Sequence, residues 1–255
     1  MPLRTRLGTR RRWLPAGLMA AALAAGPLAP AAAAAPVVMV RCPDDNLQTA
    51  INAAAPGSML LVSGTCTGPF RITRPLTLMG IGLGPTLDGR NAGTVVTVSR
   101  GVQAELNGLT ITRGKAAAGG GVNNTGRLTL FRSTVTGNGS AEGGGIYNGT
   151  GGTTTLNLSE VNGNTAIRGA GIYNKATLTL TGSTVNGNRS SGEGGGIFND
   201  TPGRATLTRS TVSGNTAARG GGIFNRGSVR LTLTQVVDNV PDNCFPRGSV
   251  PGCTG

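Results

Sequence analysis

The sequence contains no histidine, and this absence excludes several kinds of site. Among its 255 residues, no Ser-His-Asp or Cys-His nucleophile, histidine-ligated metal centre or imidazole general base can form. Aromatic residues make up only 3% of the chain and charged residues only 13%. Any catalysis would therefore depend on carboxylates, arginine, lysine or tyrosine.

Glycine is abundant instead, with 44 residues beside 14 prolines and a hydrophobic fraction of 38%. So much glycine weakens helices, whereas the hydrophobic fraction is too high for a disordered chain. Between Gly119 and Asn239, no run of about ten residues has the amphipathic period of a helix. The composition predicts short strands joined by many turns.

Residues 1–35 are typical of a secretory signal peptide. Five arginines precede an Ala/Leu-rich stretch from Trp13 to about Ala29, and an alanine run at 31–35 offers small residues for cleavage. The segment Thr9–Leu14 also resembles a twin-arginine export signal, with an ordinary Sec signal as the alternative. No other apolar run approaches the roughly 18 residues that span a bilayer. We expect a secreted or cell-surface protein without a membrane span.

The chain is basic even without this segment. Residues 1–35 contain five arginines and no acidic residue, so the remainder keeps a net charge of +8 out of +13. Such a charge favours polyanionic partners, such as acidic polysaccharide or cell-wall glycan. A bias toward arginine codons is the alternative explanation, because lysine occurs only at Lys115 and Lys175. We expect no nucleic-acid partner, because no aromatic residues are interleaved with the arginines.

Four cysteines lie near the two ends of the exported part. Export permits disulfides, and four cysteines allow three connectivities. The local pairing, Cys42–Cys66 with Cys244–Cys253, closes a short loop at each end and is the one we expect. A metal site is disfavoured, since the chain has neither a CxxC pair nor histidine.

Glycine triplets recur along the chain. They begin at Gly119, Gly143, Gly169, Gly194 and Gly220, at spacings of 24, 26, 25 and 26 residues. Four of them open the phrase Gly-Gly/Ala-Gly-Ile-Tyr/Phe-Asn, and alternating segments such as Leu-Thr-Leu follow. A period of two indicates strands with one buried face, and three strands per repeat describe a coil. Stacked coils of this kind form a parallel β-helix.

Equivalent residues of successive coils should stack in rows. Asparagines tolerate sharp corners and can hydrogen-bond along a column, so we interpret two rows as structural. The rows are Asn138, Asn164, Asn188 and Asn215, and Asn148, Asn174, Asn199 and Asn225. The residues before the triplets alternate in charge and should form a salt ladder of Glu142, Arg168, Glu193 and Arg219. An irregular turn is expected near Ser159 and Glu160.

Four segments follow from these patterns. Residues 1–35 are the signal peptide, and residues 36–58 are a cap segment with a short amphipathic helix after Asn46. Residues 59–240 form an all-β parallel β-helix of about eight coils, and residues 241–255 form a disulfide-closed tail.

Two motifs resemble a known family. The segment Leu47–Ala54, followed by Arg74-Pro75-Leu76-Thr77-Leu78, is similar to the opening of right-handed parallel β-helix proteins of the pectate-lyase-like superfamily. The glycine phrase resembles repeats of secreted bacterial β-helix proteins and of polymorphic outer-membrane proteins. The resemblance implies a right-handed β-helix but no single activity, because the superfamily contains lyases, hydrolases and adhesins.

Candidate catalytic residues are few. A pectate-lyase-like elimination needs two or three acidic groups around Ca²⁺ and a basic residue. Asp88 and Glu105 with Arg90 are the only set worth testing, and Asp88 before Gly89 also fits a turn residue. We therefore expect a non-catalytic protein without cofactor or metal, and polysaccharide lyase is the alternative, with Ca²⁺ needed only in that case.

One aromatic residue recurs in each phrase, giving the row Tyr147, Tyr173, Phe198 and Phe224. If its neighbours face inward, this row faces outward and could form a platform for sugar rings. Burial of the rings in the core or under a loop is the alternative. The sequence thus predicts a surface or extracellular interaction protein with a carbohydrate partner, of undefined oligomeric state.

Overall fold

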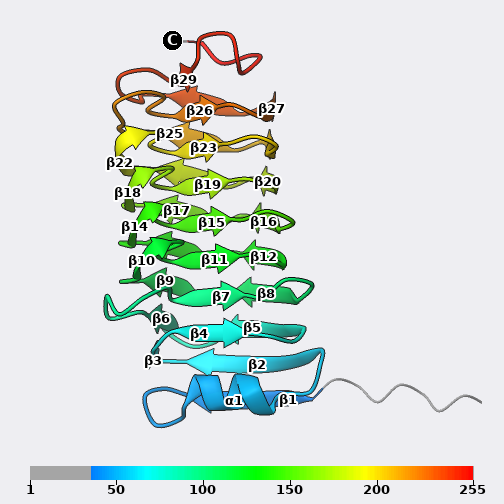
Figure 1. The fold of residues 1–255 in the computed structure, drawn as a ribbon. Coiled ribbons are helices and arrows are strands. Elements are labelled where there is room, and N and C mark those ends of the chain that lie inside the picture. Colours follow the sequence, from blue (N-terminus) through cyan, green and yellow to red (C-terminus); the bar gives the residue numbers. More distant parts are fainter. Residues whose placement is uncertain (1–35, 255) are drawn as a thin grey trace, which may run out of the picture. The chain divides into compact units, whose positions relative to one another are not determined.

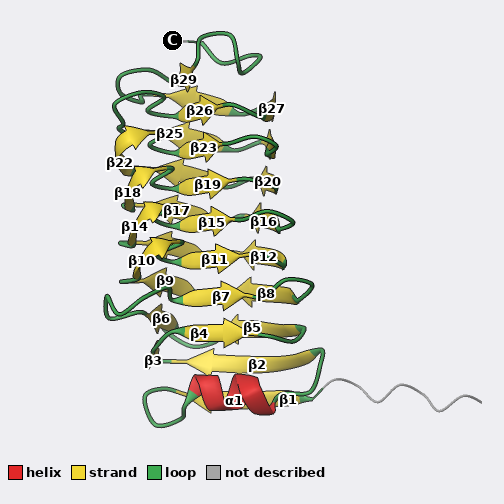
Figure 2. Cartoon of the chain, in the orientation of Figure 1, coloured by secondary structure: helices red, strands yellow, loops and turns green. Residues whose placement is uncertain are grey.

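The computed structural model describes residues 36–254, which form one compact unit. The predicted signal peptide, residues 1–35, lies outside the described residues. The described chain winds as a right-handed parallel β-helix of about nine turns, rising from the blue first coil to the red tail (Figure 1). The first coil contains β1 of sheet A and a helix, the eight coils after it pass through sheets A, B and C, and four of these add a strand of sheet D between B and C (Figure 2).

All strand pairs are parallel, and each coil contributes one strand to a sheet. Sheet A contains β1 (Val37–Arg41), β2 (Ser58–Ser63), β5 (Leu76–Gly80), β8 (Gln103–Asn107), β12 (Arg127–Phe131), β16 (Thr153–Asn157), β20 (Thr177–Thr181), β24 (Arg204–Thr208) and β27 (Ser228–Thr232). Sheet B contains β3 (Thr65–Thr67), β6 (Thr86–Asp88), β9 (Thr110–Thr112), β13 (Thr134–Thr136), β17 (Glu160–Asn162), β21 (Thr184–Asn186), β25 (Thr211–Ser213) and β28 (Gln235–Val237). Sheet C contains β4 (Phe70–Ile72), β7 (Val96–Val98), β11 (Val122–Asn124), β15 (Ile146–Asn148), β19 (Ile172–Asn174), β23 (Ile197–Asn199), β26 (Ile223–Asn225) and β29 (Cys244–Phe245). Sheet D contains β10 (Lys115–Ala118), β14 (Gly139–Glu142), β18 (Thr165–Arg168) and β22 (Arg189–Glu193).

The first coil is closed by helix α1 (Leu47–Ala53), which begins after the N-cap Asn46. The Asn46 side chain accepts a hydrogen bond from the Thr49 backbone N–H, which satisfies one free donor of the first turn. Leu47 and Ile51 are buried, so the apolar stripe of the helix covers the open end of the core. Disulfides join Cys42 to Cys66 and Cys244 to Cys253, one at each end of the stack.

Three details differ from the sequence-based expectation. Strand β1 lies within the predicted cap segment, residues 36–58, and pairs with β2, so sheet A has nine strands where about eight coils were expected. Strand β29 lies within the predicted tail, residues 241–255, and pairs with β26. The irregular turn expected near Ser159 and Glu160 is absent, because β17 pairs in register with both neighbours. The register shift lies instead between β18 and β22, where β22 is one residue longer.

Two asparagine columns run through the interior. The first asparagine column is Asn138, Asn164, Asn188, Asn215 and Asn239, and the second is Asn124, Asn148, Asn174, Asn199 and Asn225. In each column, the side-chain amide of one coil donates to the side-chain oxygen of the next, at 2.7 to 3.1 Å. These bonds satisfy polar groups that are buried, which removes the penalty of burying them.

The glycine triplets provide the corner before sheet C. Gly194 has a φ of +66°, and a Cβ there would lie 2.8 Å from the Ile197 carbonyl oxygen and 2.8 Å from the Phe198 Cβ. Only glycine avoids both the left-handed strain and the collision. The recurrence of glycine at this corner follows from this geometry.

Candidate functional site

The aromatic row of the repeated phrase is buried. Tyr173, Phe198 and Phe224 are 1%, 0% and 4% exposed, and Tyr147 is partly exposed. The rings of successive coils stack with centroids 4.9 to 5.4 Å apart, and Phe245 adds a fifth ring. The expectation that this row faces solvent as a sugar platform is therefore wrong, because stacked neighbours leave no open ring face.

Charged side chains cover this row from outside. Lys175 Nζ lies 5.4 Å from the centre of the Tyr173 ring, and Arg226 Cζ lies 5.3 Å from the centre of the Phe198 ring. The Tyr173 hydroxyl donates to Asp200 Oδ2 at 2.7 Å. Burial first, and this hydrogen bond second, raise the pKa of Tyr173. Because side chains alternate along a strand, these rings point away from the interior of the β-helix. The charged side chains described above nevertheless shield them from water.

The charged residues that precede the glycine triplets form separate ion pairs. Arg168 contacts Glu142, and Arg219 Nη2 lies 2.5 Å from Glu193 Oε1. Glu193 Oε2 also lies 3.7 Å from Arg226 Nη2. Within residues 36–254, no ion pair joins Arg168 to Glu193, although their strands are neighbours. These residues form separate ion pairs over the aromatic row and not one continuous ladder.

Asp88, Arg90 and Glu105 do not form one site. Asp88 ends β6 in sheet B and is buried, whereas Glu105 is the middle residue of β8 in sheet A. Asp88 Oδ1 accepts hydrogen bonds from Arg113 Nε and from the Arg90 backbone N–H, both at 2.9 Å. The Arg113 bond is the larger cause that lowers the pKa of Asp88. Asp88 and Glu105 therefore lie on different sides of the stack.

The described residues offer no acidic cluster for a metal. Among residues 36–254, no group of three or more His, Cys, Asp or Glu side chains is placed to hold an ion. In the same range, no helix is both long and apolar enough to cross a membrane.

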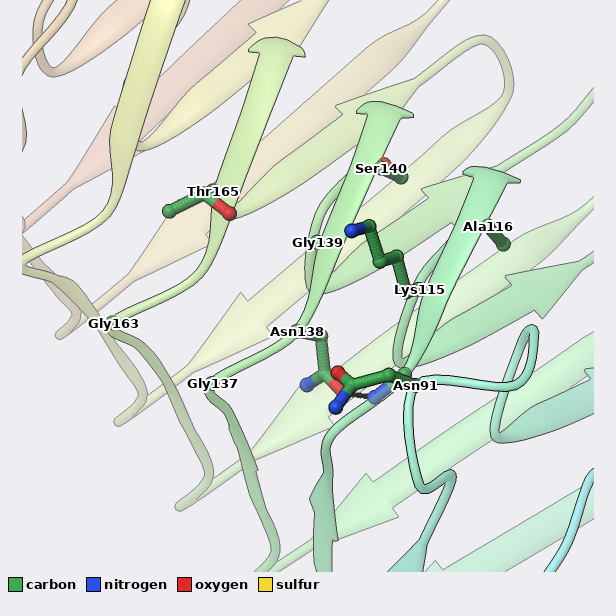
Figure 3. Close-up of a pocket in the computed structure, with 10 residues that line it drawn as sticks. Asn91, Lys115, Ala116, Gly137, Asn138, Gly139, Ser140, Gly163 and Thr165 are labelled. Atoms are coloured by element: carbon green, nitrogen blue, oxygen red, sulfur yellow. Dashed lines mark hydrogen bonds between the residues drawn. The ribbon is translucent and has the colours of Figure 1, made fainter.

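A hollow of about 480 Å³ opens on the outside of the stack, where sheet B turns into sheet D. Strand pairing places Lys115, Gly139, Thr165 and Arg189 side by side in one row across β10, β14, β18 and β22. Gly139 has no side chain, so a gap is left between Lys115 and Thr165. Figure 3 shows the Lys115 side chain extending from β10 across this gap toward Gly139.

Lys115 is the one charged residue among those that line the hollow. The loop carrying Arg90 and Asn91 is held against the next coil, because the Asn91 N–H donates to the Arg113 carbonyl at 2.6 Å and the Lys115 N–H to the Gly93 carbonyl at 2.9 Å. Arg113 is the partner of buried Asp88. Lys115 forms no ion pair with any residue of the range 36–254. The hollow can therefore accept an anionic group beside Lys115.

Sequence reasoning missed this hollow, although a signal was present. This row has intervals of 24, 26 and 24 residues between Lys115, Gly139, Thr165 and Arg189, close to the spacings of the glycine triplets. Aligning the repeats at this interval would have placed Gly139 between Lys115 and Thr165. The rows predicted from the sequence were chosen because they repeat one residue type or alternate in charge, and this row does neither.

Similarity to known proteins is limited to two solved structures. No family model matches the chain, and no curated protein matches its sequence. Two solved structures are similar: the pectate lyase Pel9A, with a TM-score of 0.47 and 15% identity over 80% of this chain, and the pectin methylesterase of Aspergillus niger, with a TM-score of 0.46 and 13% identity over 81% of this chain. The match covers 64% of the lyase and 79% of the methylesterase. The strand order above makes this chain a right-handed parallel β-helix protein.

Proposed function

We propose that the protein binds an acidic polysaccharide outside the cytoplasm without cleaving it, and that Lys115 is the main charged contact. The observation that carries the proposal is the unpaired Lys115 beside the gap over Gly139. An ammonium group free of an internal carboxylate is available to a carboxylate of the ligand. The net charge of +8 outside residues 1–35 favours the same class of partner.

The direction of the row suits a linear polymer. Lys115 and Arg189 lie on strands three coil steps apart, which corresponds to about 14 Å along the stack. Between them lie the open surface at Gly139 and the exposed Thr165 side chain. An extended anionic chain that lies along the row meets a cation at each end and a hydroxyl donor between them.

Export supports an extracellular ligand. The two disulfides form in oxidising compartments, which are the compartments where wall and matrix polysaccharides occur. We propose that residues 1–35 direct this export and that binding needs no metal ion. Addition of a chelator should then leave the affinity unchanged.

The test compares the chain's only two lysines. Affinity for polygalacturonate and alginate is measured by calorimetry, with dextran as the uncharged control polymer. Lys115→Ala should weaken binding about tenfold, because a charge-assisted hydrogen bond contributes about 1.5 kcal/mol or more. Lys175→Ala removes the same charge beside Asp200, 3.8 Å away, on another part of the coil and should change affinity less than about twofold.

Two results would contradict the proposal. Equal losses for Lys115→Ala and Lys175→Ala would mean that only net charge attracts the polymer. Appearance of the ultraviolet absorbance of an unsaturated uronate, with or without Ca²⁺, would identify a lyase and overturn the non-catalytic assignment.

A further inference from the structure

Strand β1 is the last strand of sheet A at the N-terminal end of the stack. Within residues 36–254 it pairs only with β2, so the backbone groups along its other edge have no strand partner. Val37, Val38 and Met39 are 61%, 40% and 41% exposed. An uncovered apolar edge of this kind is a template for pairing with another strand.

The exposed side chains of β1 lie on both faces of the sheet. Val38 pairs with fully buried Leu60 and so belongs to the row that faces the core. Val37 and Met39 belong to the opposite face, since side chains alternate along a strand. A flat surface pressed on one face would cover only part of this set, whereas a strand added at the edge would cover both faces.

The outer face next to this edge is also apolar. Strand pairing places Val37 beside Met59, and Leu61 between Met39 and Met79. All three methionines outside residues 1–35 thus lie on the outer face of the first three strands of sheet A. In later coils most of the corresponding positions are polar, such as Glu105, Asn107 and Thr155. Adjoining apolar side chains at the sheet edge are typical of a protein contact surface.

The helix that closes this end carries no charge. Leu47–Ala53 contains no acidic or basic residue, and its exposed positions are Thr49, Asn52 and Ala53. The opposite end of the stack is covered by the tail that the Cys244–Cys253 disulfide closes, with Val250 buried beneath it. The two ends therefore differ: the edge strand at the first end exposes three consecutive apolar residues beside an uncharged helix, whereas the edge strands at the other end, β27 and β28, expose Arg230 and Gln235.

We propose that β1 is a self-association edge, through which two copies of the chain join end to end about a two-fold axis. Antiparallel pairing of β1 with its copy places Val38 opposite Val38 and Val37 opposite Met39, so all three exposed side chains gain apolar partners. Arg41 ends the free edge, because its N–H donates to Asp45 Oδ2 and its carbonyl accepts from the Asp45 N–H, both at 2.7 Å. A two-fold contact uses each edge once, so the assembly stops at a dimer.

The test measures the mass of the chain that begins at Pro36 by sedimentation equilibrium across the micromolar range. The wild type should be a dimer, and Val38→Lys should be a monomer of unchanged circular dichroism, because a lysine at an edge blocks pairing. Val237→Lys is the matched control, since Val237 is 39% exposed on β28 at the opposite end. It should remain a dimer with the wild-type dissociation constant.

A cross-link tests the register. Val38→Cys should form a disulfide between two chains under mild oxidation, because directly opposite residues bring their Cβ atoms within reach. Val237→Cys should not. A wild type that stays monomeric, a dimer that survives Val38→Lys, or a mass that grows without limit would each overturn the proposal. So would a monomer that floats with anionic lipid vesicles, which would assign the apolar edge to a membrane.

Discussion

The early and late coils of the stack are held together by different interior side chains. The first two strands of sheet C end in Ile72 and Val98, and the next five end in the asparagines of the second asparagine column. The early coils add the helix and the Cys42–Cys66 disulfide. The late coils use directional bonds that fix the register of each coil on the next. Apolar packing alone tolerates a shift in register between neighbouring coils, whereas a column of hydrogen-bonded amides does not.

The largest effect should come from breaking a column. Asn188 Nδ2 donates to Val161 O and to Asn215 Oδ1, and its Oδ1 accepts from Asn164. Asn188→Leu leaves these buried groups unpaired, so the free energy of unfolding should fall by about 3 to 5 kcal/mol in chemical denaturation. Asn186→Leu, two residues earlier and facing outward, is the control and should change it by less than about 1 kcal/mol. Equal effects would mean that the column is not what holds the late coils.

The next effect separates backbone strain from packing. Gly194 and Gly101 both have left-handed φ, +66° and +76°, but a Cβ would collide only at Gly194, since nothing lies within 4 Å at Gly101. Gly101→Ala should lower the free energy of unfolding by about 1 kcal/mol and Gly194→Ala by about 2 to 3 kcal/mol. Thermal unfolding of both variants measures the difference. Identical losses would remove close packing as the reason for the triplets.

A smaller effect concerns the ion pairs over the aromatic row. Glu193→Arg would place a third cation beside Arg219 and Arg226. These pairs are largely exposed on the arginine side, so the loss should be about 1 kcal/mol at low salt and less at high salt. Denaturation midpoints at two ionic strengths measure it. A salt-independent loss would assign the role of Glu193 to packing.

The smallest effect is the loss of stability at low pH. The pKa of Asp88 is lowered in the folded state, chiefly by its Arg113 bond. The stability that this carboxylate contributes is therefore fully present above its unfolded pKa, near 3.8, and is lost as pH falls further. The amides of the late coils do not titrate. Below about pH 4, the backbone amides in the coil of Asp88 should exchange hydrogen faster than those in the late coils. Arg113→Ala should reduce this difference in exchange rate.

The sequence predicts the repeating part of the molecule well, because each row there repeats one residue type. The helix expected after Asn46 is also present. Two site predictions were wrong for physical reasons. The alternation of side chains along a strand does not reveal that Arg226 and Lys175 cover the outward-facing rings. The sequence positions of Asp88 and Glu105 do not reveal that the two residues lie in different sheets.

The hollow was missed because its defining feature is a missing side chain. Gly139 is one glycine among 44, and only strand pairing shows that it separates Lys115 from Thr165. The edge at β1 was missed because the residues before α1 have no counterpart among the repeats.

The most direct test of the proposed function fills the hollow. The φ of Gly139 is not left-handed, and a Cβ there would lie 3.2 Å from Thr165 Oγ1, which can rotate away, so Gly139→Gln should fold normally. Binding in the hollow predicts that this variant loses about tenfold in affinity for polygalacturonate, because the ligand meets a side chain beside Lys115. Thr179→Gln, on the outer face of sheet A, should bind like the wild type. Full affinity of Gly139→Gln in calorimetry would show that the polysaccharide does not bind in this hollow.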